Sequence, residues 1–122
     1  MRLRILVADD NRDNAESCAM LLQLSGHEVR VAYSGEEALV LAAEFGPQMA
    51  LLDIRMPNMT GYDVARRMRA APWGKDLLLV AVTGLGQVAD KRAAEEAGFD
   101  HHLSKPFTLD ALKPLFERCS QR

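Results

Sequence analysis

Three continuous apolar runs, each ending at a polar residue, constrain the fold of this chain more than any other feature. The runs are residues 5–8, 49–52 and 77–82. Apolar runs of this length without polar alternation are typical of strands buried on both faces of a parallel sheet. Two further segments, residues 28–31 and 101–103, are alternating or polar, which suits exposed edge strands. We therefore expect five strands, with the three apolar ones in the middle of the sheet.

Helical patterns follow the strands along the chain. Apolar residues recur three and four positions apart in four segments, which are residues 15–22, 38–45, 61–68 and 109–119. A fifth segment, residues 88–97, is alanine-rich and less clearly amphipathic, so we expect it to pack more loosely. Strand and helix thus alternate five times. This order predicts an α/β fold whose right-handed crossovers place helices on both faces of a doubly wound parallel sheet.

Residues that typically begin or end helices lie close to the ends of these expected helical segments. Ser34 is a typical helix-capping residue, with Glu37 three positions later. Glycines fall where three helices are expected to end, at Gly26, Gly46 and Gly98. Pro114 lies inside the last helical pattern and has no backbone N–H, so we expect a kink or a restart of that helix.

Length and composition indicate one globular domain and argue against several classes of function. The 122 residues suit one domain, 1–122, and 48% hydrophobic with 26% charged residues is ordinary for a globular chain. A net charge of −2 argues against nucleic-acid binding by overall charge. No apolar run approaches the roughly 20 residues that a membrane span requires. We find no signal-peptide pattern and no CxxC spacing, so we expect a cytoplasmic domain with reduced thiols.

Five polar residues lie at or just beyond the C-terminal end of a predicted strand. They are Asp9, Asp10, Asp53, Thr83 and Lys105. In an open parallel sheet these strand ends converge on the edge where ligands bind. A lone aspartate after a strand is usually a turn or cap residue, but carboxylates, a hydroxyl and an ammonium group from four strands are hard to obtain by chance. We therefore expect one site.

The chemistry of the expected site follows from its charges. Three carboxylates in one pocket repel one another, and a hard divalent cation such as Mg²⁺ relieves that repulsion. Asp9 and Asp10 are placed to bind the metal, and Lys105 adds a compact positive charge. Asp53 stands alone after the central strand, so it is the best candidate for a nucleophile that forms an acyl phosphate. Thr83 and Lys105 would hold phosphoryl oxygens.

Four motifs together resemble the receiver domain of two-component response regulators. They are Asp9-Asp10, Asp53-Ile54-Arg55-Met56-Pro57 with Gly61, Thr83-Gly84, and Lys105-Pro106-Phe107. The resemblance covers essentially the whole chain. It implies a flavodoxin-like (βα)5 fold with strand order 2-1-3-4-5, which agrees with the edge strands expected above.

The resemblance also implies a function and a set of ligands. A phosphoryl group would pass from a phosphohistidine of a sensor histidine kinase, or of a histidine phosphotransfer domain, to Asp53. The reaction would depend on Mg²⁺ or Mn²⁺, held by Asp10, Asp53 and the backbone carbonyl of Arg55, with Asp9 bound directly or through water. The domain would be a phosphoacceptor rather than an enzyme, with no nucleic-acid or membrane contact of its own.

Switching is implied in the same way. Phosphorylation would draw the Thr83 hydroxyl inward and alter the face formed by the fourth helix, fifth strand and fifth helix, which a downstream protein target would read. The Lys105–Pro106 peptide is expected to be cis. Many receivers carry Tyr or Phe three residues before the lysine, whereas this chain has His102. His102 is either a plain surface-strand residue or a part of the switch.

Two further expectations rest on the resemblance. Residues 97–106 look most like receivers of hybrid sensor kinases, so the chain could be such a domain or a free-standing regulator. The residues that flank the path of a hydrolysing water are Arg55 and Leu85. Neither offers a side-chain acceptor that could serve as a general base, which predicts slow self-dephosphorylation.

Three other functions fit the pattern less well. Aspartyl phosphatases of the haloacid dehalogenase type carry D-x-D after the first strand, whereas this chain has Asp9-Asp10-Asn11. A flavodoxin-like FMN carrier needs a phosphate-binding loop there, and adjacent carboxylates would repel the phosphate. A docking module that works without phosphorylation is the third alternative, and the intact acidic set argues against it.

Overall fold

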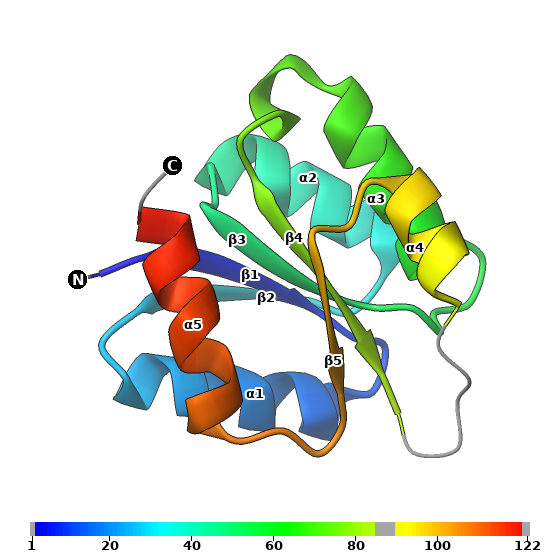
Figure 1. Ribbon diagram of the computed structural model, residues 1–122. Helices are drawn as coiled ribbons and strands as arrows, with labels where there is room; N and C mark the ends of the chain where they lie inside the picture. Colours follow the sequence, from blue (N-terminus) through cyan, green and yellow to red (C-terminus); the bar gives the residue numbers. More distant parts are fainter. Residues whose placement is uncertain (1, 85–89, 121–122) are drawn as a thin grey trace.

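Five parallel strands form one sheet in the order β2-β1-β3-β4-β5 in the computed structural model, which describes residues 2–84 and 90–120 (Figure 1). The strands are β1 (Arg4–Ala8), β2 (Glu28–Ala32), β3 (Met49–Asp53), β4 (Leu78–Thr83) and β5 (His101–Ser104). β3 and β4 are buried along their whole length, whereas β2 and β5 are partly exposed edges. The predicted flavodoxin-like strand order is confirmed.

Five α-helices cover the two faces of the sheet within the described residues. They are α1 (Arg12–Leu24), α2 (Gly35–Phe45), α3 (Gly61–Ala70), α4 (Lys91–Ala97) and α5 (Leu109–Ser120), with a short 3₁₀ helix, η1 (Pro72–Gly74), after α3. Helices α1 and α5 lie on one side, and α2, α3 and α4 on the other (Figure 1). No described helix is both long and apolar enough to cross a membrane.

Each face of the sheet has its own hydrophobic core, because alternate strand residues point to opposite sides. The core we name the α1/α5 core contains Val7, Leu51, Val82 and Phe116 among its buried residues. The core we name the α2/α3/α4 core contains Ala8, Leu52, Ala81 and Met68. Each apolar strand therefore contributes to both cores, which explains its uninterrupted apolar sequence.

The expected cap of α2 at Ser34 and the expected glycines at three helix ends are confirmed. The Ser34 hydroxyl accepts a hydrogen bond from Glu37 N at 3.1 Å and caps α2. Gly26, Gly46 and Gly98 all have positive φ at the ends of helices. Helix α4 begins at Lys91, capped by the Asp90 side chain, so the expected start at residue 88 lies outside the described residues.

A kink or a restart of the last helix was expected at Pro114. The restart is wrong, since α5 runs without a break from Leu109 to Ser120, whereas the kink stays a prediction. Pro114 lies in the second turn, where the missing N–H removes one helical hydrogen bond. The neighbouring Leu112, Leu115 and Phe116 are buried in the α1/α5 core. Their packing on the sheet holds the helix together across that gap.

Candidate functional site

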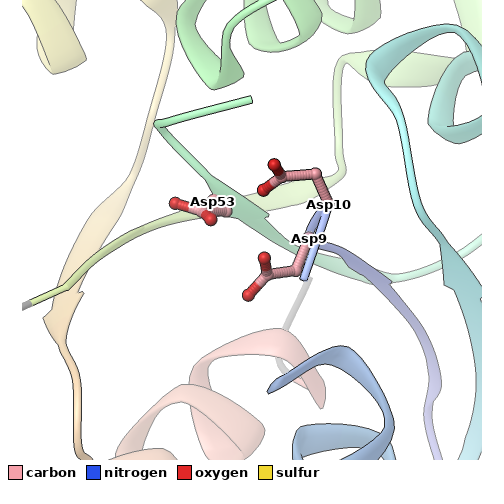
Figure 2. A group of neighbouring side chains, drawn as sticks. All are labelled: Asp9, Asp10 and Asp53. Atoms are coloured by element: carbon pink, nitrogen blue, oxygen red, sulfur yellow. The ribbon is translucent and has the colours of Figure 1, made fainter. Parts of the chain in front are cut away.

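Three carboxylates meet at the C-terminal ends of β1 and β3. Each of Asp9, Asp10 and Asp53 offers an oxygen, and these oxygens all lie within 4.8 Å of one another (Figure 2). The two strands are neighbours, and Ala8 pairs with Leu52, so the residues that follow this pair are brought together. Asp9 and Asp53 are buried, whereas Asp10 is exposed.

Lys105 adds a positive charge to this cluster. Its Nζ lies 2.6 Å from Asp9 Oδ2 and 3.8 Å from Asp53 Oδ2. The lysine follows β5, and its backbone N donates to the Thr83 carbonyl at the end of β4. The Lys105–Pro106 peptide is cis, as the resemblance implied. One ammonium group thus offsets part of the charge of three carboxylates.

Backbone hydrogen bonds orient the two buried carboxylates. Asp9 Oδ1 accepts a bond from Asn11 N at 2.9 Å, and Asp53 Oδ1 accepts one from Arg55 N at 3.1 Å. Aspartate side chains commonly bond the backbone two residues ahead in this way. Each bond stabilises the turn that follows a strand and leaves the second oxygen directed to Lys105.

Gly61 allows α3 to begin close beneath the acidic cluster. Its N donates to the Ile54 carbonyl at 3.0 Å. A Cβ at this position would lie 2.6 Å from the Asp53 carbonyl oxygen and 2.9 Å from Ile54 Cα, which is closer than real contacts allow. A glycine is therefore required for the helix to meet the strand end here.

Burial is the main reason that the pKa of Asp53 is raised from 3.8 to about 6. The charge of Asp9 raises it further, and Lys105 acts in the opposite direction. A carboxylate that is costly to ionise, beside two others, is a set of hard oxygen ligands suited to a divalent cation. The residues present therefore fit a Mg²⁺ ion.

Thr83 and His102 form a second pair at the same edge of the sheet. Thr83 is buried at the end of β4, and its Oγ1 lies 2.8 Å from Nε2 of the half-buried His102 on β5. Both side chains line a cavity of about 20 Å³ beside Ala81 and α4, on the side of the α2/α3/α4 core. Asp9, Asp53 and Lys105 instead line a cavity on the α1/α5 side.

Two more side chains adjoin the acidic residues, of which Cys18 was not foreseen and Phe107 was noted only as part of a family motif. Cys18 and Phe107 line the same small cavity as Asp9, Asp53 and Lys105. The helical spacing marks Cys18 only as a core residue, and no sequence signal connects it with the strand ends. Burial raises the pKa of the Cys18 thiol to about 11, so it stays protonated.

Arg55 and Leu85 are the residues expected to flank the path of a hydrolysing water. Arg55 is exposed, and its backbone N donates to Asp53. Leu85 lies outside the described residues. Slow self-dephosphorylation therefore stays a prediction from the sequence.

Sequence comparison places the chain among known signalling proteins. The family model described as the response regulator receiver domain matches residues 5–117. The response regulator MprA of Mycolicibacterium vanbaalenii is 39% identical over 112 residues, which are 92% of this chain and 48% of that protein. MprA of Mycobacterium tuberculosis is 38% identical over the same share. The chain thus spans about half the length of these relatives.

Solved structures show the same likeness. The chemotaxis protein CheY4 of Vibrio cholerae has a TM-score of 0.88 and 25% identity, covering 98% of this chain and 99% of that one. The receiver domain of the sensor histidine kinase PA1611 of Pseudomonas aeruginosa has a TM-score of 0.88 and 26% identity over the whole of both chains. That structure has a magnesium ion coordinated in its active-site cleft.

The sheet order, the acidic edge and the family match lead to one assignment. The family model covers nearly the whole chain, including every residue of the acidic cluster and Lys105. This chain belongs to the response regulator receiver domain family of two-component signalling systems.

Proposed function

We propose that Asp53 accepts a phosphoryl group from a phosphohistidine of a sensor histidine kinase or a histidine phosphotransfer domain. The observation that carries this proposal is the convergence of a buried Asp53 with two more carboxylates and Lys105 at one sheet edge. Because the chain matches about half of its MprA relatives, the activity and partners of a whole protein are part of the proposal. A receiver of a hybrid kinase and a free-standing regulator both fit.

Mg²⁺ would be held by Asp10, Asp53 and the backbone carbonyl of Arg55, with Asp9 bound directly or through water. The close approach of the three carboxylates supports this ligand set. When bound, a hard divalent cation such as Mg²⁺ or Mn²⁺ neutralises charge on the carboxylates and on an entering phosphoryl group. The magnesium ion in the PA1611 receiver supports the same site in this chain.

The residues of the chain account for the transfer step. A carboxylate oxygen of Asp53 attacks phosphorus, the P–N bond to the donor imidazole breaks, and its electron pair returns to that nitrogen. Asp53 Oδ1 is held by Arg55 N, and Oδ2 faces Lys105 at 3.8 Å. Lys105 would bind a phosphoryl oxygen of the product, and the Thr83 hydroxyl would bind another after moving toward Asp53.

The output of the domain would be a change in the α4-β5-α5 face that a downstream protein target reads. Thr83 ends β4 and contacts His102 on β5, and α4 lines the cavity beside both residues. Movement of one hydroxyl would therefore alter packing under this face.

Phosphorylation by a small phosphodonor tests the proposal. We expect wild-type chain incubated with acetyl phosphate and Mg²⁺ to gain one acid-labile phosphoryl group, detected by intact mass. Asp53→Asn should abolish the gain because no nucleophile remains. Asp110→Asn, which removes an exposed carboxylate on α5, should incorporate phosphate as wild type does.

Other outcomes of this experiment point to the alternatives. Full incorporation in Asp53→Asn would overturn the assignment of the phosphoacceptor. Continuous release of phosphate from a phosphomonoester would indicate a small aspartyl phosphatase. A wild-type chain that never gains phosphate under any donor would favour a docking module that works without phosphorylation.

A further inference from the structure

The side chain of His102 holds the hydroxyl that the proposed function requires elsewhere. Thr83 is 5% exposed, and within the described residues the bond that its hydroxyl makes is the one to His102 Nε2 at 2.8 Å. A threonine hydroxyl has a single proton to donate. While that proton is donated to His102, it is not available to a phosphoryl oxygen on Asp53.

We propose that His102 is a positioning residue that competes with the phosphoryl group for the Thr83 hydroxyl, so that protonation of His102 favours the phosphorylated conformation. The inference rests on the proposed function, because it concerns how Thr83 becomes available to Asp53. It assigns to His102 a hydrogen-bonding role that depends on its charge.

The three forms of the imidazole act differently on Thr83. A neutral ring with its proton on Nδ1 has a bare Nε2, which accepts the Thr83 proton and keeps it from Asp53. A neutral ring with its proton on Nε2 donates to Oγ1 instead. A protonated ring can only donate at Nε2, so the Thr83 proton is always free for a phosphoryl oxygen. Protonation thus removes the competing form.

The surroundings of His102 favour the neutral ring before phosphorylation. Burial lowers the pKa of His102, and the nearby His101 and Lys91 lower it further. The cavity that His102 shares with Thr83 is also lined by Asp90 and Lys91 of α4 and by Tyr62 of α3. The groups around His102 thus include the negative Asp90 and the positive Lys91. The Asp90 side chain also caps α4.

Phosphorylation should raise the pKa of His102 in two ways, through added charge and through loss of a hydrogen bond. The phosphoryl group adds negative charge at the sheet edge, which favours the imidazolium form. Withdrawal of Thr83 toward Asp53 removes the hydrogen bond that favoured a bare Nε2. The pKa of His102 should therefore rise, and by linkage, acid should stabilise the phosphorylated conformation by the same factor.

An NMR titration of the full chain tests this linkage. Fluoroberyllate with Mg²⁺ serves as the probe, since it mimics a phosphoryl group on a carboxylate. The imidazole Cε1–H signal reports the pKa of His102, and the signal of His101, which is exposed and points to the opposite face of β5, serves as a reference. We expect the pKa of His102 to rise by about one unit with the probe.

Substitutions separate the hydrogen bond from the added charge. In Thr83→Val, which keeps the shape of the side chain but has no hydroxyl, the rise in the pKa of His102 should be clearly smaller. The ratio of the affinity for fluoroberyllate at about pH 6 to that at about pH 7.5 should be higher in wild type than in His102→Gln, because both chains share the titration of Asp53 and only wild type has the His102 imidazole. A pKa change of one unit corresponds to up to tenfold in that ratio. His101→Gln, the matched control, keeps the Thr83–His102 pair, so it should keep the wild-type pH dependence apart from a small displacement to higher pH, because a neighbouring charge that lowers the pKa of His102 is gone.

The outcomes distinguish the inference from the proposed function. Fluoroberyllate that binds while the pKa of His102 stays constant or falls overturns the inference alone. A rise of equal size in Thr83→Val also overturns it, because the hydroxyl would then have no part. If Asp53 takes up neither fluoroberyllate nor phosphate, the proposed function fails, and this inference fails with it.

Discussion

Asp53 combines two demands that conflict in a single carboxylate. In the proposed function it must be ionised to attack phosphorus, yet its place at the end of β3 buries it and puts Asp9 beside it. Lys105 at 3.8 Å reduces this conflict without removing it, since the pKa of Asp53 is still raised to about 6. The residue is thus costly to keep charged in the folded chain, and that cost has a measurable dependence on pH.

The metal-free chain should lose stability relative to Asp53→Asn as the pH rises. The folded pKa of Asp53, about 6, exceeds the ordinary value of 3.8. Its contribution to the free energy of unfolding is therefore present below about pH 4 and is lost as the pH rises through about 6. Asparagine does not titrate. Urea unfolding in EDTA at several pH values should show the advantage of Asp53→Asn growing from about pH 4 to 7.

The exposed Asp110→Asn variant provides the control for this titration. Its free energy of unfolding should follow wild type across the same pH range. A constant difference between Asp53→Asn and wild type would show that Asp53 has the same pKa in the folded and unfolded chains.

Mg²⁺ should stabilise the unphosphorylated chain, because the carboxylates proposed to bind it are gathered only in the folded state. The expected gain is about 0.4 kcal/mol when free Mg²⁺ equals its Kd, and more above it. Asp10→Asn should melt higher than wild type in EDTA, since one repelling charge is gone, and should respond less to Mg²⁺. Thermal melting with and without millimolar Mg²⁺ measures both effects. An unchanged wild-type Tm would contradict the metal site.

The junction of β3 and α3 shows how elements are positioned around the site. Helix α3 starts with a capping box, in which Thr60 and Asp63 bond each other's backbone N–H. Gly61 then brings the first turn against the end of β3. The receiver motif includes this glycine, but only the geometry explains it, because the absent Cβ would meet backbone atoms that cannot rotate away.

Gly61→Ala should destabilise the fold by roughly 1–3 kcal/mol, as overpacking in a well-packed interior does. The added methyl group would push α3 away from the Asp53 carbonyl, so phosphoryl uptake should fall as well. Chemical unfolding and the phosphodonor assay measure the two effects. Gly46→Asn is the control, because nothing lies within 4 Å of that position and asparagine tolerates its φ of 63°. Equal losses in both variants would contradict the argument from close approach.

The elements that were predictable from sequence are those set by local pattern. Burial on both faces dictates continuous apolar strands, and the caps at Ser34 and Gly46 are local chemistry. The possible restart of the helix at Pro114 does not occur, because the burial of its neighbours in the α1/α5 core, which sequence does not reveal, holds the helix together. The convergence of the acidic residues was predictable, since parallel topology alone brings the strand ends together.

Sequence predicts which residues form the site better than it predicts which of their side chains contact one another. The sequence does not indicate that Lys105 lies closer to Asp9 than to Asp53, because that depends on the path of the chain after β5. The bond between Thr83 and His102 likewise depends on which face each side chain points to. Such contacts require the register of β4 and β5, which pairs Ala81 with His102.

At the scale of the whole molecule, Arg69 on α3 connects segments that no local pattern joins. Its guanidinium donates to the carbonyls of Gly98, Gly74 and Leu77 and to the carboxylate of Asp100. These groups belong to the end of α4, η1 and the approaches to β4 and β5. One partly buried side chain thus fixes the end of the sheet opposite the acidic cluster.

Arg69→Met should lower the free energy of unfolding by about 2–3 kcal/mol, because it removes a largely buried ion pair together with several hydrogen bonds. The matched control is Arg66→Met on the same helix, where the ion pair with Asp63 is exposed and should contribute at most about 1 kcal/mol. Chemical unfolding of both variants measures the contrast. Similar losses would show that the Arg69 contacts contribute little.

The separation of the two cores has a consequence for how this domain can diversify. Asp53 and Lys105 face the α1/α5 core, whereas Thr83 and His102 face the α2/α3/α4 core. Changes on opposite sides of a sheet that share no contacts tend to have additive effects. A lineage could therefore change the surface of α1, over one core, without disturbing the surface of α4, over the other, so that contacts made through these two helices can diverge one at a time.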